Sequence, residues 1–470
     1  RIRFRTLSMS WQTKSRTRRA TMPEILLIHP PVYDFTAFDL FVYPLGLMHV
    51  AEALVEHGYH VDLIDALDRF ADVPPSAGLR PPTFRKDGCG HFHRRQIPPP
   101  PHLSDIPRRY HRFGLPAEIL KKRIAKREPP AAVAISCTMT YWYSGVLETV
   151  NLIRSLWPGV PVLLGGTYAL LCPDHALTHI RADWVQTSRD LKPFLDFIES
   201  VTSRPAVPSV ESDFSGHSLV QGRTTAAVQA STGCARRCPY CASHLLDGPY
   251  HARPQDEVVC EISELITQLG RTQIAFYDDA LLHDHGTAFL ALLSELRDRN
   301  LHKQAAFHCP NALSASAITL EAAMALKETH FRMIRIGFET ADHSLQKELG
   351  GKATNEHLET ALDNLKRAGF KNQEIGVYIL AGLPGQSRES VERSLRFVHK
   401  AGGISRLAEF SPVPGTPLFT ETARISRLDL TEPLNHNKTL APFRFKDFTF
   451  EDVQGLKALA QQLNRSCLQS

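Results

Sequence analysis

The sequence predicts an α/β protein in which an N-terminal, doubly wound, Rossmann-like parallel sheet is followed by a partial (β/α)6 barrel of the TIM type. Short apolar runs alternate with longer segments of helical spacing up to about residue 200, and the alternation restarts at 225. Residues 201–224 contain a stretch rich in Ser, Pro and Gly, which predicts a linker between the two series. Because strands that alternate with helices pair in parallel, each series predicts its own parallel sheet.

The first series predicts the N-terminal domain, residues 22–200. Its strands are expected at 24–28, 60–64, 131–137 and 160–164 and near Val185, and its first helices at 45–57 and 145–157. Residues 71–130 interrupt the pattern and contain four consecutive prolines. A segment of that length is too long for an ordinary connection, so we expect an insertion with a functional or interface role.

The second series predicts the barrel, residues 225–420, and a helical extension over 421–470 follows it. The barrel strands are expected near 225–231, 273–277, 304–308, 333–338, 374–380 and 406–411. Helical spacing lies between them at 256–269, 286–299, 319–329, 355–368 and 387–401. Six strands with intervening helices are typical of an incomplete parallel barrel.

The charge of the 470-residue chain is unevenly distributed. The net charge is +5, but the first 20 residues carry seven Lys and Arg and no acid, which leaves −2 for the rest. We expect residues 1–21 to be a disordered basic tail, derived from translated upstream sequence rather than from an organellar transit peptide. The near-neutral body argues against a nucleic-acid partner. No apolar run is long enough for a transmembrane helix, and we expect a cytoplasmic protein.

Positive charge also gathers in the insertion. Between Arg80 and Arg127 there are 13 Arg and Lys against three acids. Such a segment binds an anionic substrate or forms a solvated or interdomain face, and the sequence leaves both open.

Three of the nine cysteines form a tight group. Cys234, Cys238 and Cys241 have the spacing Cys-x3-Cys-x2-Cys, and no fourth Cys is near. Three thiolates hold three irons of a [4Fe-4S] cluster, so one iron would stay open to an outside ligand. An open metal position is typical of a catalytic site. The alternative is a zinc site with His244 as the fourth ligand.

This motif, with Tyr240 before the last Cys and a barrel strand before the loop, resembles the radical S-adenosylmethionine (radical SAM) enzymes over residues 225–420. The resemblance implies that the open iron chelates the amino and carboxylate groups of SAM. The reduced cluster would cleave the sulfonium bond, and the 5′-deoxyadenosyl radical would take a hydrogen atom from a small-molecule substrate. An electron donor such as flavodoxin or ferredoxin is implied as well.

Polar and small residues follow the predicted barrel strands, where a barrel places its site. Asp278 or Asp279 is expected to contact the SAM ammonium or ribose, unless it caps the next helix. Asn311 is expected to bond cofactor or substrate, or to serve a turn. By resemblance, Glu339 binds ribose and the fifth-strand motif approaches adenine. The expected cofactor contacts are Tyr240, Asp278, Asp279, Asn311, Glu339, Tyr378, Gly382 and Pro384.

The N-terminal domain resembles the cobalamin-binding-type domain that often precedes a radical SAM barrel. The resemblance is carried by Pro30-Pro31, by Tyr43 to Leu47, and by Gly165-Gly166. No Asp-x-His-x-x-Gly motif marks a histidine as a cobalt ligand. Many members with this domain arrangement also lack the motif, so its absence leaves cobalamin open as a further cofactor. Cobalamin would imply methylation or rearrangement of a small molecule. A degenerate domain that acts as a lid or scaffold is the alternative.

Two other functions stay open. A methylthiotransferase-like enzyme would hold a second cluster on Cys89, Cys137 and Cys172, although the surrounding motifs do not match. A non-catalytic binding or regulatory protein would have kept only the fold. Within the insertion, Cys89, His91 and His93 also suggest a second metal site.

Overall fold

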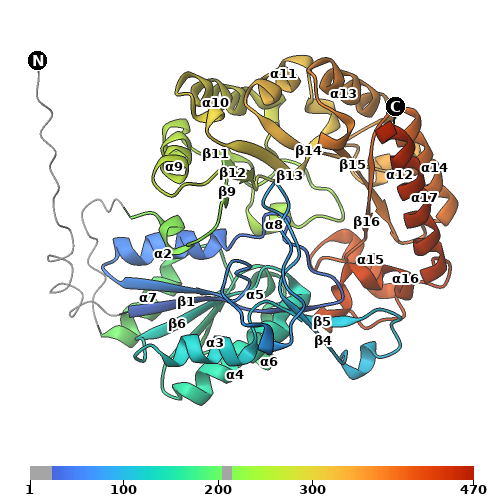
Figure 1. Ribbon diagram of the computed structural model, residues 1–470. Helices are drawn as coiled ribbons and strands as arrows, with labels where there is room; N and C mark the ends of the chain where they lie inside the picture. The colour runs from blue at the N-terminus through green and yellow to red at the C-terminus, as the bar shows by residue number, and fades with distance from the viewer. Residues whose placement is uncertain (1–23, 204–213, 470) are drawn as a thin grey trace, which may run out of the picture.

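Two parallel sheets organise the computed structural model, which describes residues 24–203 and 214–469 (Figure 1). The predicted tail, residues 1–21, lies outside the described residues, as does part of the predicted linker. The six-stranded sheet lies above the five-stranded sheet in Figure 1, and the C-terminal helices line the right-hand side. The predicted α/β class with two parallel sheets is confirmed.

The N-terminal sheet has the strand order β3-β1-β6-β7-β8, with every pair parallel. Numbered within this sheet alone, the order is 2-1-3-4-5, which is a doubly wound arrangement. The chain direction across the sheet reverses between β1 and β6, so ligands of this fold bind beyond the carboxyl ends of these strands. The strands are β1 (Glu24–His29), β3 (His60–Asp65), β6 (Ala132–Ser136), β7 (Val162–Gly165) and β8 (Trp184–Val185).

Alternate residues of β1 explain why both faces of this sheet are covered. Leu27 packs with α2 (Leu45–Glu56) and α7 (Lys192–Thr202), and Leu26 packs with α3 (Ala117–Ala125) and α4 (Tyr143–Leu156). Successive side chains of a strand point to opposite faces, so a strand buried on both faces is a continuous apolar run. The short helices α5 (Thr167–Leu171) and α6 (Pro173–His179) connect β7 to β8.

The second sheet is an open barrel with the order β16-β15-β14-β13-β12-β9. All of its pairs are parallel, and β9 and β16 are its edges. The strands are β9 (Thr225–Val228), β12 (Gln273–Phe276), β13 (Ala306–Ser314), β14 (Phe331–Glu339), β15 (Ile375–Ala381) and β16 (Ser405–Glu409). The helices are α9 (Gln255–Thr267), α10 (Thr287–Asp298), α11 (Leu320–Glu328), α12 (His343–Glu348), α13 (Asn355–Arg367) and α14 (Arg388–Lys400).

The two sheets share one hydrophobic core. The cluster of buried residues that contains α2 and the first face of β1 continues into the barrel strands and their helices. The linker residue His217 joins the two halves, since its ring nitrogens lie 2.9 Å from the Tyr43 hydroxyl and 2.9 Å from a Glu261 carboxylate oxygen. The N-terminal domain is therefore held against the barrel by both apolar packing and buried polar contacts.

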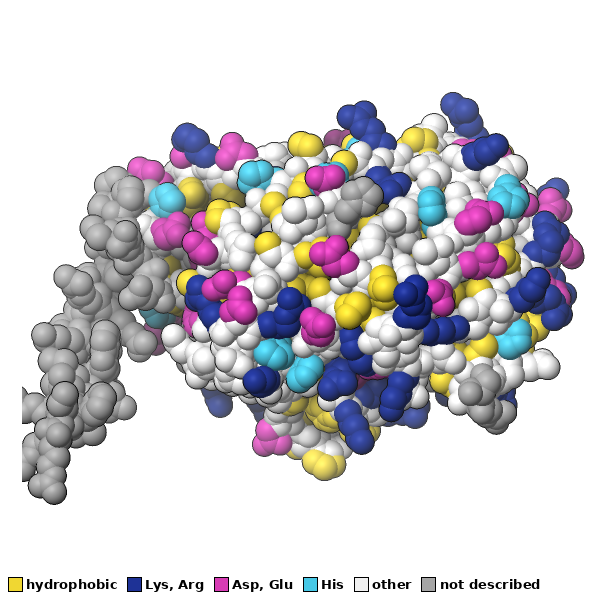
Figure 2. Space-filling model, turned by 90° about the horizontal axis from the view of Figure 1, so that it is seen from above, with side chains coloured by type: hydrophobic (Ala, Val, Ile, Leu, Met, Phe, Trp, Pro, Cys, Tyr) yellow, Lys and Arg dark blue, Asp and Glu magenta, His cyan; other side chains and the backbone are white. Residues whose placement is uncertain are grey.

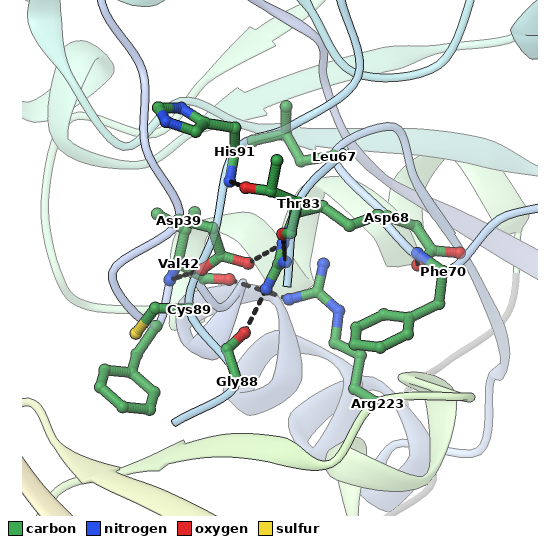
Figure 3. Close-up of polar contacts among 12 residues, drawn as sticks. Asp39, Val42, Leu67, Asp68, Phe70, Thr83, Gly88, Cys89, His91 and Arg223 are labelled. Carbon is green, nitrogen blue, oxygen red and sulfur yellow. Dashed lines mark hydrogen bonds and ion pairs between the residues drawn. The ribbon is translucent and has the colours of Figure 1, made fainter. Parts of the chain in front are cut away.

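The insertion contributes two strands, and the segment after β1 contributes a third, to a small antiparallel sheet that the helix–strand alternation did not predict. Its order is β2-β5-β4, with β2 (Val32–Asp34), β4 (Arg94–Ile97) and β5 (Tyr110–Phe113). Arg69, which is 2% exposed, ties the insertion to the body. Its guanidinium donates to Asp39 at 2.7 Å, to the Thr83 carbonyl at 2.7 Å and to the Gly88 carbonyl. Figure 3 labels these three partners, which lie close together.

The C-terminal extension closes over the carboxyl edge of the N-terminal sheet. The Asn437 amide donates to the buried Asp34 at 2.9 Å, and His436 Nδ1 lies 3.0 Å from the Thr140 hydroxyl. The fully buried Arg444 donates to three backbone carbonyls around this segment. The helices are α15 (Pro417–Ile425), α16 (Ala441–Arg444) and α17 (Phe450–Gln469), and α17 packs on α14.

The surface seen in Figure 2 mixes acidic and basic side chains over most of its area, with a group of Lys and Arg toward its lower edge. Among the described residues, no helix has the length and apolar character needed to cross a membrane.

Candidate active site

The three clustered cysteines lie on the loop that follows β10 (Ser231–Thr232) at the start of the barrel. The loop is held at both ends, because the Cys234 amide donates to the Gly248 carbonyl at 3.2 Å and the Leu418 amide donates to the Pro239 carbonyl at 3.0 Å. The Arg236 amide donates to Cys234 Sγ at 3.4 Å. A backbone N–H directed at sulfur favours a thiolate over a thiol.

The three thiols are close enough to influence one another's pKa values. Burial raises the pKa of Cys234 and of Cys238, and the neighbouring thiols of the group raise both pKa values further. Cys241 Sγ lies 3.1 Å from the Ser243 hydroxyl. A bound iron–sulfur cluster would offset this repulsion, because its positively charged metal ions favour the deprotonated thiols.

Asp278 holds the beginning of this loop. Its carboxylate accepts from the Ala230 amide at 3.1 Å, from the Ser231 amide at 2.5 Å and from the Ser231 hydroxyl at 2.6 Å. Burial raises the pKa of Asp278 to about 6, against the lowering effect of these hydrogen bonds. The structure thus gives Asp278 a positioning contact with the cysteine loop, and its predicted contact with the cofactor stays a prediction.

Glu339 and Lys352 form an ion pair beside the cysteine loop. The Lys352 ammonium lies 2.5 Å from the Glu339 carboxylate, and the Tyr240 hydroxyl donates to the same carboxylate oxygen at 3.1 Å. Glu339 ends β14 with a φ of +71°, a conformation that non-glycine residues seldom adopt and that is found at functional sites. Tyr240 and Glu339, predicted separately, are therefore in direct contact.

Lys352 and Gly337 belong to this group and were missed from the sequence. A Cβ atom on Gly337 would lie 2.6 Å from the Lys352 ammonium, so the glycine makes the space that the lysine occupies. Burial lowers the pKa of Lys352, but Glu339, Cys238 and Cys241 together outweigh burial and raise this pKa overall, so the residue stays charged. In the sequence, Lys352 is visible only as a single lysine after Gly350-Gly351, and no motif links it to Glu339.

Asp279 and Asn311 border the same end of the barrel. Asp279 is solvent-exposed, but the protein around its carboxyl removes enough water to raise its pKa; Asp247 raises this pKa further and a hydrogen bond with Ser243 lowers it. The Asn311 amide donates to the Tyr277 carbonyl at 2.8 Å and so ties β13 to the end of β12. Asn311 therefore has the turn-type contact that was one of its two predicted roles.

The fifth-strand residues point to different places. The Tyr378 hydroxyl donates to the Pro310 carbonyl at 3.3 Å across the barrel. Gly382 has a φ of +85°, and a Cβ atom there would lie 2.9 Å from Ala441. The close approach that this glycine permits is thus made by the C-terminal extension, whereas its predicted approach to adenine stays untested. Pro384 lies half-buried in the turn after β15.

The other candidate cysteines are separated. Cys89 packs with Phe41 and the barrel residues Ala275 and Met333, whereas Cys137 packs in the N-terminal sheet. Figure 3 shows the Cys89 sulfur and the His91 ring pointing to different sides of the insertion. Within residues 24–203 and 214–469, no three His, Cys, Asp or Glu side chains are arranged to hold a single metal ion.

A cavity of about 220 Å³ opens between the N-terminal sheet and helices α2 and α7. Its wall includes Gly46, Ser136, Gly165 and Gly166. Cβ atoms on Gly46 or Gly165 would meet nothing closer than 3.8 Å, so both positions face open space. Ser188 and Arg189 also line an adjoining cavity of about 230 Å³, which reaches barrel residues including Leu245 and Pro414.

His49 lines the first cavity and was not singled out by the sequence, because no motif surrounds it. Burial lowers its pKa, which favours the neutral imidazole. The two adjoining cavities run from the helix-covered face of the sheet to the barrel, and the glycine-lined wall fits the insertion of a flat group.

The family model described as the radical SAM superfamily matches residues 228–398, which run from the end of β9 into α14. The barrel is a radical SAM domain. The three-cysteine loop lies inside this domain, so the predicted radical SAM character of residues 225–420 is confirmed for the barrel. The Cys-x3-Cys-x2-Cys loop, Tyr240 and Glu339 all fall within the matched residues.

Solved structures share the fold of nearly the whole chain. The radical SAM methyltransferase TsrM of Kitasatospora setae, solved with cobalamin and a [4Fe-4S] cluster, is 15% identical with a TM-score of 0.65, over 93% of this chain and 91% of TsrM. The cobalamin-dependent radical SAM enzyme OxsB is 12% identical with a TM-score of 0.55, over 94% of this chain and 57% of OxsB. At these identities the likeness concerns the fold.

Curated relatives match parts of the chain. A protein of Pyrococcus horikoshii described as an uncharacterized methyltransferase is 24% identical over 71% of this chain and 78% of its own length. The tRNA-2-methylthio-N(6)-dimethylallyladenosine synthase of Corynebacterium efficiens is 22% identical over 58% of this chain, and the chain spans 55% of that relative.

Removing the Asp278 charge should loosen the cysteine loop. In Asp278→Asn an amide N–H₂ replaces one acceptor oxygen, so at least one donor of Ala230 or Ser231 loses its partner. The free energy of unfolding should fall by about 1–3 kcal/mol, and amide hydrogen exchange at 230–234 should accelerate. Asp298→Asn, an exposed residue at the end of α10, is the control. Unchanged exchange in Asp278→Asn would remove the proposed support.

Proposed function

We propose that the chain reductively cleaves SAM at a [4Fe-4S] cluster and uses the resulting radical on a small molecule, with cobalamin as a further cofactor for methylation or rearrangement. The observation that carries this proposal is the placement of the three-cysteine loop beside the buried Glu339–Lys352 pair. The pair offers one anionic and one cationic group to a ligand that has both an ammonium and a carboxylate.

The chain's own residues divide the work of holding these groups. Cys234, Cys238 and Cys241 would ligate three irons, and the fourth would stay open. Lys352 would hold the SAM carboxylate, and Glu339 would hold the ribose or the ammonium. When bound and reduced, the cluster supplies the electron that breaks the sulfonium bond. The surrounding apolar residues, among them Leu349, Leu383 and Phe410, exclude water from this chemistry.

The glycine-lined cavity of the N-terminal domain supports cobalamin binding. Gly46, Gly165 and Gly166 leave room between the sheet and α2 for the flat nucleotide base of the cofactor, and Ser136 and Arg189 supply polar contacts. The adjoining cavity toward Leu245 and Pro414 opens on the barrel side, where the corrin would lie outside these two small cavities. Bound there, cobalamin supplies a transferable methyl group. TsrM and OxsB, whose fold this chain shares, both bind cobalamin.

The remaining parts of the proposal follow from the chemistry. A [4Fe-4S] cluster must be reduced from outside, which calls for an electron donor such as flavodoxin or ferredoxin in the cytoplasm. A small-molecule substrate is supported by the TsrM structure solved with tryptophan. The relation to tRNA methylthiotransferases supports a second candidate less well, because Cys89 lies apart from Cys137 and Cys172.

Cys238→Ala tests the cluster assignment. The loss of one ligand should reduce bound iron from about four per chain to about one or fewer and abolish 5′-deoxyadenosine formation after anaerobic reconstitution and dithionite reduction. Cys260→Ala, an exposed thiol on α9, should keep both. Iron analysis and chromatographic product detection provide the readouts. SAM cleavage by Cys238→Ala at the wild-type rate would refute the assignment.

Gly46→Leu tests the cobalamin cavity independently of activity. A leucine there fills the open space between α2 and the sheet, so retention of hydroxocobalamin after gel filtration should fall by about tenfold or more. The fold should survive, because leucine favours the helix more than glycine does. Gly159→Leu, whose Cβ also meets nothing within 4 Å, is the matched control. Equal corrin absorbance in the wild type and both variants would contradict the site.

A further inference from the structure

The inner wall of the barrel carries two arginines below the proposed SAM site. Ile334 and Ile336 of β14 pack into the core beneath the outer helices. Because successive side chains of a strand point to opposite faces, Arg335 and Gly337 face the barrel interior. The same alternation on β15 places Val377 in the core and Gly376 and Tyr378 inside.

Arg406 of β16 joins this inner face. It is the register partner of Tyr378, and Arg335 is the register partner of Gly376. A Cβ atom on Gly376 would lie 3.1 Å from Arg335 Nη1 and 3.1 Å from Arg406 Cγ. The two arginines therefore lie side by side over the glycine that separates them.

This pair has no acidic partner. Arg335 is 8% exposed, and its guanidinium donates to the Ile334 carbonyl at 3.0 Å. Burial lowers the pKa of Arg335, Tyr378 opposes that effect, and Arg406 adds repulsion. Among the described residues, no carboxylate lies within 4.0 Å of either guanidinium, although other arginines of the barrel, such as Arg253, have one. A buried cation without a counter-charge is costly, and an anion would offset that cost.

The pair is accessible and close to the proposed chemistry. Arg406 is exposed on β16, an edge strand, so the site is reached from the open side of the barrel. Gly337, over which the Lys352 ammonium sits, follows Arg335 by two residues on the same face. Two residues of a strand span about 7 Å. A group bound by the arginines would therefore lie about 7 Å from the Lys352 ammonium, toward the N-terminal ends of the barrel strands.

We propose that Arg335 and Arg406 bind an oxyanion of the substrate, a carboxylate or a phosphate, inside the barrel. Guanidinium groups pair with both in two-pronged fashion, and Tyr378 offers a further hydroxyl at the same wall. This inference rests on the proposed function, since it places the anionic end of the substrate below the radical source. The substrate class is thus an organic acid or a phosphate ester.

The insertion offers a competing basic surface. Arg80 and Arg94 lie against each other there, because the Arg80 amide and the Arg94 carbonyl pair at 2.9 Å, and Arg80 lowers the pKa of Arg94 further than burial alone. These two arginines belong to the small antiparallel sheet and its neighbouring segment, not to the barrel wall. An experiment on the barrel pair must therefore separate the two surfaces.

Isothermal titration of the anaerobically reconstituted enzyme with sodium acetate and with sodium phosphate, at constant ionic strength, tests the proposal. At least one probe should bind the wild type, and the one that binds identifies carboxylate or phosphate as the group. Arg335→Gln and Arg406→Gln should each weaken that binding by about tenfold. Arg335→Lys keeps the charge and should weaken it less than Arg335→Gln does.

Arg396→Gln, which removes an exposed arginine on the outer helix α14, should bind as the wild type does. Circular dichroism checks folding, and Arg406→Gln keeps the test informative if Arg335→Gln fails to fold. The proposal is overturned if neither probe binds, if both arginine variants bind normally, or if the loss follows Arg94→Gln instead. Formation of 5′-deoxyadenosine by the same preparations is measured separately, so its absence would count against the proposed function and not against the anion site.

Discussion

The Lys352–Glu339 ion pair is the interaction on which the arrangement of the site depends. It joins three segments that are distant in the sequence: the cysteine loop through Tyr240, the end of β14, and the turn after α12. A largely buried lysine requires its carboxylate, and the carboxylate in turn keeps Tyr240 in place. Gly337 leaves the space that the ammonium occupies, so the contact among Lys352, Glu339 and Tyr240 depends on the absence of a side chain at position 337.

The same turn also approaches the cysteine loop directly. Gly350 has a φ of +95°, and a Cβ atom there would lie 3.9 Å from Cys238 Sγ. The backbone of the turn thus lies close to the proposed iron ligand, and Lys352 follows two residues later. A cationic group in this position favours thiolates at Cys238 and Cys241 and attracts an anionic ligand to the same end of the barrel.

The C-terminal extension fixes the position of the N-terminal domain relative to the barrel. Asp34, buried beside the switch point of the N-terminal sheet, accepts from Trp142 at 2.8 Å and from Asn437 at 2.9 Å. Burial raises the pKa of Asp34, against these hydrogen bonds. The contact fixes the C-terminal extension over the carboxyl edge of the sheet, and the same extension packs on Gly382 of the barrel. The crevice between the domains is therefore bounded on more than one side.

The sequence predicted the strands and the cysteine loop because their signals are local. Parallel strands buried on both faces read as apolar runs, and the Cys spacing needs no tertiary information. Lys352 and the Arg335–Arg406 pair were not predictable in this way. Arg332 and Arg335 both lie on β14, and only the packing of its neighbours Ile334 and Ile336 shows which arginine faces inward. The antiparallel sheet of the insertion was missed because its strands are short and polar.

The central claim is that the Glu339–Lys352 pair holds SAM against the cluster. Electron paramagnetic resonance of reduced, iron-replete Lys352→Met, recorded with and without SAM, tests it most directly. Wild type and the exposed-lysine control Lys347→Met should show a cluster signal that changes on addition of SAM. Lys352→Met should keep the signal but need about tenfold more SAM for the same change, with partial recovery in Lys352→Arg. A Lys352→Met spectrum that responds to SAM at the wild-type concentration would contradict the account.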